Sequence, residues 1–164
     1  MKTLYLIRHA KSSWDDITLP DFDRPLNERG KKNAPFMGKV LNTLGIQPDL
    51  MVSSNAKRAI TTAKKIAEEV GYDKSKIKEE PNIYEASVKT LLQIVNQLDD
   101  KHKVVFMFGH NPGFTDFANY LSDANLVNIP TCGIARIDFD TKHWAEVSRS
   151  TGHLSYFDFP KNHL

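Results

Sequence analysis

Two apolar segments of the sequence each run almost directly into a histidine. Residues 4–7 are followed by Arg8 and His9, and residues 104–108 are followed, after one glycine, by His110. Apolar runs of this kind are typical of buried strands. Side chains just beyond the carboxyl ends of strands in an α/β sheet face the crevice where ligands bind. The sequence therefore predicts two imidazoles and a guanidinium at one edge of a sheet.

A third predicted strand, residues 49–53, leads into the turn Ser53-Ser54-Asn55 and then to Arg58. Arg58 would lie in the first turn of a helix, where unpaired backbone N–H groups and the helix dipole favour an anion. A guanidinium offers a planar fork that matches phosphate oxygens. The three strand ends together predict a pocket for a small dianion, and phosphate fits this chemistry best.

Two of these segments resemble signatures of the histidine phosphatase (phosphoglycerate mutase-like) superfamily. Leu-Ile-Arg-His-Ala is similar to its Arg-His-Gly signature, with Ala10 in place of the usual Gly. Residues 53–63 are similar to its Ser-Pro-x-x-Arg-Ala-x-x-Thr-Ala segment, with Asn55 where Pro is common. The resemblance places the family's catalytic quartet at Arg8, His9, Arg58 and His110.

The resemblance implies a double-displacement mechanism without metal or cofactor. Neutral His9 would attack phosphorus and become phosphorylated, and water would then hydrolyse the phosphohistidine. The other three members of the quartet would stabilise the negative charge on the transferring phosphoryl oxygens. Ser12 and Asn111 are further expected phosphate contacts.

Two carboxylates are candidates for a proton donor to the leaving group. Relatives that act on phosphate esters often carry a Glu in this role, and Glu85, just before a predicted helix, is the best-placed match. A carboxylate that merely favours the start of that helix is an equally good explanation. Asp15, seven residues after Arg8, is the other candidate, although a carboxylate there would repel phosphate unless protonated or paired.

The chain most resembles the SixA-like branch of the superfamily. The similarity rests on Arg-His-Ala-Lys-Ser-Ser-Trp, on residues 23–30 and on Gly-His-Asn-Pro-Gly, and it extends over most of residues 1–150. This branch is associated with removal of phosphate from protein phosphohistidine. The expected partner is therefore a phosphorylated protein of the histidine-phosphotransfer type, or else a small phosphate ester.

Three other functions remain open from the sequence. A general phosphomonoesterase would act on small metabolites or phosphoserine. An aspartate-nucleophile phosphatase is suggested by Asp138-Phe139-Asp140-Thr141 and by Asp21-Phe22-Asp23, and magnesium dependence would distinguish it. A module that binds phosphate without turnover would keep the pocket but not the chemistry.

Composition limits the class of protein further. With 164 residues and 40% hydrophobic content, residues 1–164 are expected to form a single domain. The net charge of +2 is spread along the chain, so nucleic acid is not an expected partner. No apolar stretch of spanning length and no signal-peptide pattern is visible, so neither a membrane nor secretion is expected. The single cysteine, Cys132, fits the expected cytoplasmic location.

Strand and helix patterns alternate along the chain. They predict a three-layer α/β/α sandwich with a mostly parallel mixed sheet and a C-terminal antiparallel hairpin. Expected helices cover residues 27–44, with Asn27 as cap and a kink or broken first turn from Pro35; about 54–70, capped by Ser54 or Asn55; 87–98; and 111–121, with Asn111 as cap and Pro112 at the first helical position. The hairpin is expected to pair residues 135–139 with 144–148.

Overall fold

The computed structural model describes all 164 residues, and the strands form one six-stranded sheet in the order β3-β2-β4-β1-β5-β6. The strands are β1 (Lys2–Arg8), β2 (Leu50–Ser53), β3 (Lys78–Glu79), β4 (Val104–Gly109), β5 (Ile134–Phe139) and β6 (Gly152–Asp158). The pairings β1–β4, β2–β4 and β2–β3 are parallel, whereas β1–β5 and β5–β6 are antiparallel. The predicted mixed sheet with a C-terminal antiparallel hairpin is confirmed.

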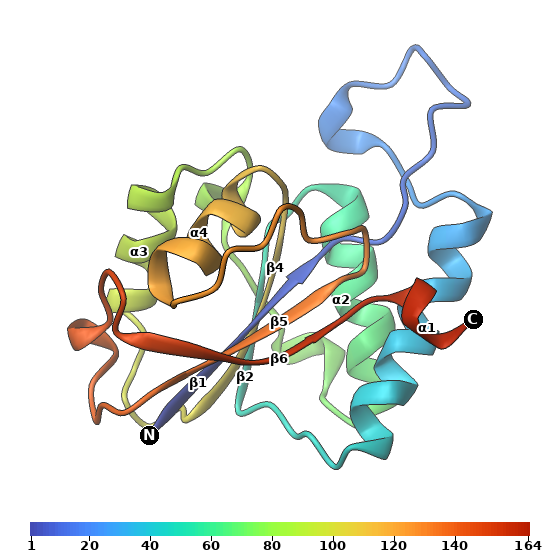
Figure 1. The fold of residues 1–164 in the computed structure, drawn as a ribbon. Coiled ribbons are helices and arrows are strands. Elements are labelled where there is room, and N and C mark those ends of the chain that lie inside the picture. The colour runs from blue at the N-terminus through green and yellow to red at the C-terminus, as the bar shows by residue number, and fades with distance from the viewer.

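Four helices cover the two faces of the sheet. Helices α1 (Glu28–Thr43) and α2 (Lys57–Val70) lie on one face, and α3 (Val88–Asn96) and α4 (Gly113–Leu121) lie on the other (Figure 1). The architecture is the predicted three-layer α/β/α sandwich. None of the helices is both long enough and apolar enough to cross a bilayer.

Alternation of side chains along the central strands divides the core into two clusters. Tyr5 and Ile7 of β1 pack in the cluster under α1 and α2, whereas Leu4 and Leu6 pack in the cluster under α3 and α4. Neighbouring β4 divides in the same way, and both strands are almost entirely buried. Burial on both faces explains why these strands are continuous apolar runs, and it fixes where their last residues emerge.

The first helix begins as predicted but continues through its proline. The Asn27 side chain accepts a hydrogen bond from the Gly30 backbone N–H, which confirms the cap. The helix runs unbroken past Pro35 to Thr43, so the first turn is not broken. Packing of its buried face against the sheet outweighs the one hydrogen bond that proline cannot donate.

Two other helix starts differ from the prediction. Helix α2 follows Ala56 and has no side-chain cap, because the Ser54 hydroxyl accepts from the Ala56 N–H before the helix begins. Helix α4 begins one residue later than expected, so Pro112 precedes its first residue. The Asn111 side chain still accepts from the Thr115 N–H and so satisfies a donor of the first turn.

The predicted partner strand of the hairpin is wrong. Residues Trp144–Glu146 form a short 3-10 turn, and β6 is the strand that pairs with β5. Trp144 is fully buried, and its indole N–H donates to the His102 carbonyl. The Asn96 amide also donates to the Trp144 and Val147 carbonyls. The backbone of this segment is therefore bonded to other elements and not to β5, and Trp144 and Val147 are buried without forming a strand.

Candidate active site

The register of the sheet brings the three polar strand ends together. Arg8 of β1 lies opposite Gly109 of β4, and Ser53 of β2 lies opposite Phe108 of the same strand. The residues one position further on, including His9 and His110, therefore emerge side by side. The centroids of the two imidazole rings are 5.2 Å apart. The predicted convergence at one sheet edge is present in the structure.

The His9 ring is held with one nitrogen free. Its Nδ1 lies 2.7 Å from the Ala10 carbonyl oxygen, and because that oxygen can only accept, Nδ1 carries the proton. In the neutral ring the lone pair is therefore on Nε2. Burial, together with the charges of Arg58, Arg8 and Arg24, lowers the pKa of His9 to about 4. At neutral pH His9 is an uncharged imidazole with a free Nε2, which is the form that a nucleophile requires.

His110 has the opposite arrangement of its ring nitrogens. Its Nε2 lies 2.8 Å from the Ser54 hydroxyl, while its buried Nδ1 has no partner. Burial is the main cause that lowers the pKa of His110 to about 3, and the nearby His9 and Arg58 add to it. Both imidazoles are therefore neutral in the free protein, and a hydroxyl that donates to Nε2 leaves Nδ1–H as a donor.

Arg8 contributes a second buried polar atom without a partner. Its Nη1 donates to the Ile129 carbonyl at 3.0 Å, whereas its Nε has no hydrogen bond. Buried donors without partners are rare in folded proteins. An oxyanion that reached both atoms would satisfy the arginine Nε and the histidine Nδ1. These two atoms are the clearest structural sign of an anion site.

Asn111 supports the site through its neighbours. Its side-chain amide donates to the Asn128 side chain and to the Ile129 carbonyl, the same carbonyl that holds Arg8. Its carbonyl oxygen accepts from Thr115. Because the side chain is fully engaged, a direct contact with phosphate would fall to the Asn111 backbone N–H.

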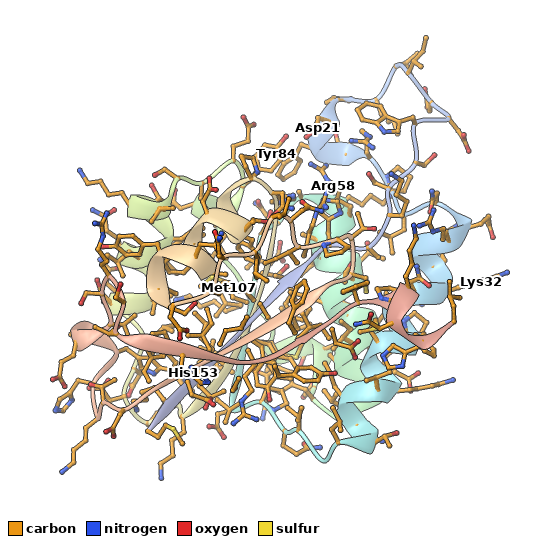
Figure 2. All side chains as sticks on the ribbon, in the orientation of Figure 1. Asp21, Lys32, Arg58, Tyr84, Met107 and His153 are labelled. Atoms are coloured by element: carbon orange, nitrogen blue, oxygen red, sulfur yellow. The ribbon has the colours of Figure 1, made fainter.

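Arg58 lies at the same edge, but part of its guanidinium is already bonded to a carboxylate. Its Nη2 donates to Asp21 Oδ2 at 2.9 Å and its Nη1 to the Asp21 carbonyl at 2.6 Å. The hydroxyl of Tyr84 also donates to Asp21 Oδ2, at 2.6 Å. Figure 2 shows Arg58 and Tyr84 close to Asp21, which lies in the loop that projects between β1 and α1.

Arg24 is a site residue for which the sequence motifs suggested no role. It is 7% exposed, and its charge is among the causes that lower the pKa of His9. It donates to the Ser12 hydroxyl at 2.6 Å and to Asp21 Oδ1 at 3.0 Å. Its occurrence in Asp-Arg-Pro-Leu-Asn, within the family-like residues 23–30, was the only signal in the sequence. Ser12 thus contacts an arginine of the site.

The two candidate proton donors lie in different places. Glu85 is exposed and lines a pocket of about 600 Å³ together with Arg58, Tyr84 and His110. Asp15 is exposed on the projecting loop, where its backbone N–H donates to the Ser13 hydroxyl and its carboxyl has no hydrogen bond or ion pair. The structure therefore brings Glu85 beside Arg58 and His110, whereas no contact links Asp15 to any member of the quartet.

The geometry gives no support to an aspartate nucleophile in the late hairpin. The Asp138 side chain accepts hydrogen bonds from Thr3 and Arg136 near the start of β1, at the opposite end of that strand from Arg8. No group of three or more His, Cys, Asp or Glu side chains could hold a metal ion. Cys132 is buried, and burial raises the pKa of its thiol to about 12.

Comparison with known proteins agrees with this geometry. The model of the histidine phosphatase superfamily (branch 1) matches residues 4–106. An uncharacterised chloroplast protein of Arabidopsis thaliana is 31% identical over 159 residues, which cover 92% of this chain and 72% of that protein. The chain belongs to the histidine phosphatase superfamily.

Solved structures place the chain in the SixA-like branch. A candidate phosphohistidine phosphatase SixA from Agrobacterium tumefaciens superposes with a TM-score of 0.81 at 27% identity, covering 97% of this chain and 98% of that one. The protein histidine phosphatase SixA complexed with tungstate superposes with a TM-score of 0.85 at 18% identity, covering 99% of both chains, and this match concerns the fold alone. The protein is a SixA-like phosphatase.

Protonation of His9 should occur well below the usual range for histidine. We expect NMR of the ¹³C-labelled imidazoles to give a midpoint near 4 for His9, against 6.5 for an ordinary histidine. Between these values the unfolded chain takes up a proton that the folded protein does not, so the free energy of unfolding decreases as pH falls. A midpoint close to the ordinary value would contradict the burial argument.

Proposed function

We propose that this protein hydrolyses phosphohistidine on a partner protein through a covalent phosphoryl-His9 intermediate. The observation that carries the proposal is the free Nε2 of neutral His9 beside two buried donors without partners, on Arg8 and His110. A phosphoryl group placed there would meet a nucleophile on one side and fixed donors on the others. Such preorganised donors are the main source of catalysis in phosphoryl transfer.

The reaction has two displacements. In the first, the His9 Nε2 lone pair forms a bond to phosphorus while the P–N bond of the substrate breaks, and the substrate imidazole leaves with a proton. In the second, water attacks phosphorus, the bond to His9 breaks, and inorganic phosphate is released. Arg8, Arg58 and His110 stabilise the charge on the phosphoryl oxygens during both steps.

The choice of a P–N over a P–O substrate rests on the protons that the pocket can supply. An alkoxide leaving group is strongly basic and needs a positioned acid, whereas an imidazole is readily protonated from solvent. Asp21 and Glu85 are the two carboxyl groups on the pocket wall. Hydrogen bonds from Tyr84 and from the two arginines keep the pKa of Asp21 far below the usual range. It therefore stays ionised. Glu85, the remaining carboxyl on the pocket wall, is exposed at the mouth.

The family relationship supports the same substrate class. Both SixA structures are described as histidine phosphatases, one of them of protein substrates. The pocket has a volume of about 600 Å³ and exposed residues such as Glu85 and Pro112 on its wall, which suits a side chain presented by a protein. Arg8, Arg24 and Arg58 supply the positive charge that a metal ion provides in other phosphatases, so we propose a metal-independent reaction.

A comparison of substrates tests the proposal. We expect kcat/KM for a phosphorylated histidine-phosphotransfer domain to exceed that for phosphoserine and sugar phosphates by at least about 100-fold. The alkoxide of an ester needs a positioned acid to protonate it as it leaves, whereas imidazole takes its proton from solvent. EDTA should leave the rate unchanged. Glu85→Gln should also leave the phosphohistidine reaction unchanged.

Two results would contradict this choice of substrate. If esters react as well as phosphohistidine and Glu85→Gln abolishes ester turnover, the protein is a general phosphomonoesterase with Glu85 as its acid. If EDTA removes activity and magnesium restores it, the metal-independent mechanism is wrong. A protein that binds tungstate but turns over none of these substrates would be a phosphate-binding module.

A further inference from the structure

The Asp21 carboxylate joins groups from distant parts of the chain at the wall of the pocket. It accepts hydrogen bonds from Arg58 in the first turn of α2, from Arg24, which is three residues after Asp21, and from the hydroxyl of Tyr84. The Asp21 backbone carbonyl adds a second hydrogen bond from Arg58. Neither displacement of the proposed reaction uses Asp21.

The two arginines that Asp21 holds are both almost fully buried. Arg24 and Arg58 are each 7% exposed, whereas the Asp21 side chain is 49% exposed. The Arg24 guanidinium is also fixed through its Nε to the Ser13 carbonyl and lies 3.3 Å from the centroid of the Trp14 ring. Arg58 has no other hydrogen-bonded partner for its side chain, so Asp21 alone determines its orientation by hydrogen bonds.

The geometry leaves part of the Arg58 guanidinium available. Asp21 occupies one N–H of Nη1 and one of Nη2, and the remaining N–H groups of the fork have no partner. A long arginine side chain has considerable rotamer freedom, which must be lost before it can act as a fixed donor. The hydrogen bonds to Asp21 remove that freedom before substrate arrives.

We propose that Asp21 is a positioning residue that orients Arg58 and Arg24 for the transferring phosphoryl group. The inference rests on the proposed function. It assigns to Asp21 neither the nucleophilic role considered from the sequence nor a role as proton donor. Tyr84 completes the arrangement because its hydroxyl fixes the carboxylate from the side of the pocket wall.

The alternative role for Asp21 is inhibitory, as a carboxylate that competes with phosphate for Arg58. A carboxylate on Arg58 could block the site, so that phosphate must displace it. The two roles predict opposite changes in turnover. If Asp21 positions Arg58, its removal lowers kcat; if it blocks Arg58, its removal tightens oxyanion binding and raises kcat/KM. The contact of Asp21 with the buried Arg24 favours positioning, because a carboxylate that only blocked Arg58 would not require a bond to a second arginine.

The test compares Asp21→Asn with Asp23→Asn. Asparagine keeps the shape of the side chain but replaces one carboxylate oxygen with an NH₂ group, so it cannot accept from both arginines. Asp23 lies in the same 3-10 turn, is exposed, and its carboxyl makes no hydrogen bond or ion pair, so its variant loses the same charge without the contacts. Tyr84→Phe removes only the third contact.

We expect Asp21→Asn to lower kcat about 10- to 100-fold, the effect of a misplaced catalytic donor. The KM and the Kd for tungstate should stay unchanged or decrease, because a negative charge has left the pocket. Tyr84→Phe should have a smaller effect in the same direction, and Asp23→Asn should resemble the wild type. Equal or higher kcat in Asp21→Asn would overturn the proposal.

Arginine side-chain NMR provides a readout that does not depend on activity. In the wild type we expect slowly exchanging Nη protons from Arg58, whose side chain is hydrogen-bonded to Asp21 alone, and we expect Asp21→Asn to lose them with little change in Tm. Persistence of these signals would overturn the proposal even if no substrate is turned over. Loss of activity in His9→Ala, by contrast, tests the proposed function and does not affect this result.

Discussion

Replacing His9 by alanine should abolish phosphoryl transfer. His9 and His110 are both neutral imidazoles with one ring nitrogen free, but only in His9 does a backbone carbonyl hold the proton on the other nitrogen and so leave the lone pair on the free one. We expect kcat to fall at least about 10⁴-fold, the order of loss typical when a covalent nucleophile is removed. Rapid quench with labelled substrate should trap one acid-labile phosphoryl group per chain in the wild type and none in His9→Ala.

The matched control for this variant is His153→Ala. His153 is exposed on β6, away from the site in Figure 2, so its loss should leave both label and turnover unchanged. Binding of tungstate to His9→Ala would show that the pocket is still formed. Label retained in His9→Ala, or transferred to another residue with turnover intact, would contradict the assignment of the nucleophile.

Replacing Arg58 by alanine should have the second largest effect. Arg58 is the guanidinium that α2 delivers to the site, and removal of one preorganised donor costs about 100- to 1000-fold in kcat. We expect Arg58→Lys to recover only part of this loss, because an ammonium keeps the charge without the planar fork. His110→Ala should lower kcat to a similar extent, since His110 supplies a donor to the same oxygens.

Lys57→Ala is the control for the Arg58 variants. Lys57 is the preceding residue of the same helix, is exposed and has the same charge, so its loss should change kcat little. The comparison separates the effect of position from that of total charge. Near wild-type turnover in Arg58→Ala would remove Arg58 from the catalytic machinery. Equal losses in Lys57→Ala and Arg58→Ala would reduce the role of Arg58 to long-range electrostatics.

The tertiary structure decided several features that no local pattern contains. Asp21 and Tyr84 are 63 positions apart and bond to each other because the projecting loop and the segment before α3 meet over α2. The low pKa values of His9 and His110 depend on burial and on neighbours from other elements. The error at residues 144–148 has the same origin, because hydrogen bonds from Asn96 and to Asp100 determine that backbone.

The sequence by itself determined the parts that depend on local periodicity and on chain direction. Continuous apolar runs predicted β1 and β4, and the residues after them had to emerge at one edge because parallel strands point the same way. Chain direction therefore placed His9 and His110 together, and the helix predicted after β2 added Arg58. Local patterns could not reveal Arg24 or the role of Asp21, because their function depends on distances across space, and those distances are fixed only when the loop packs on the helix.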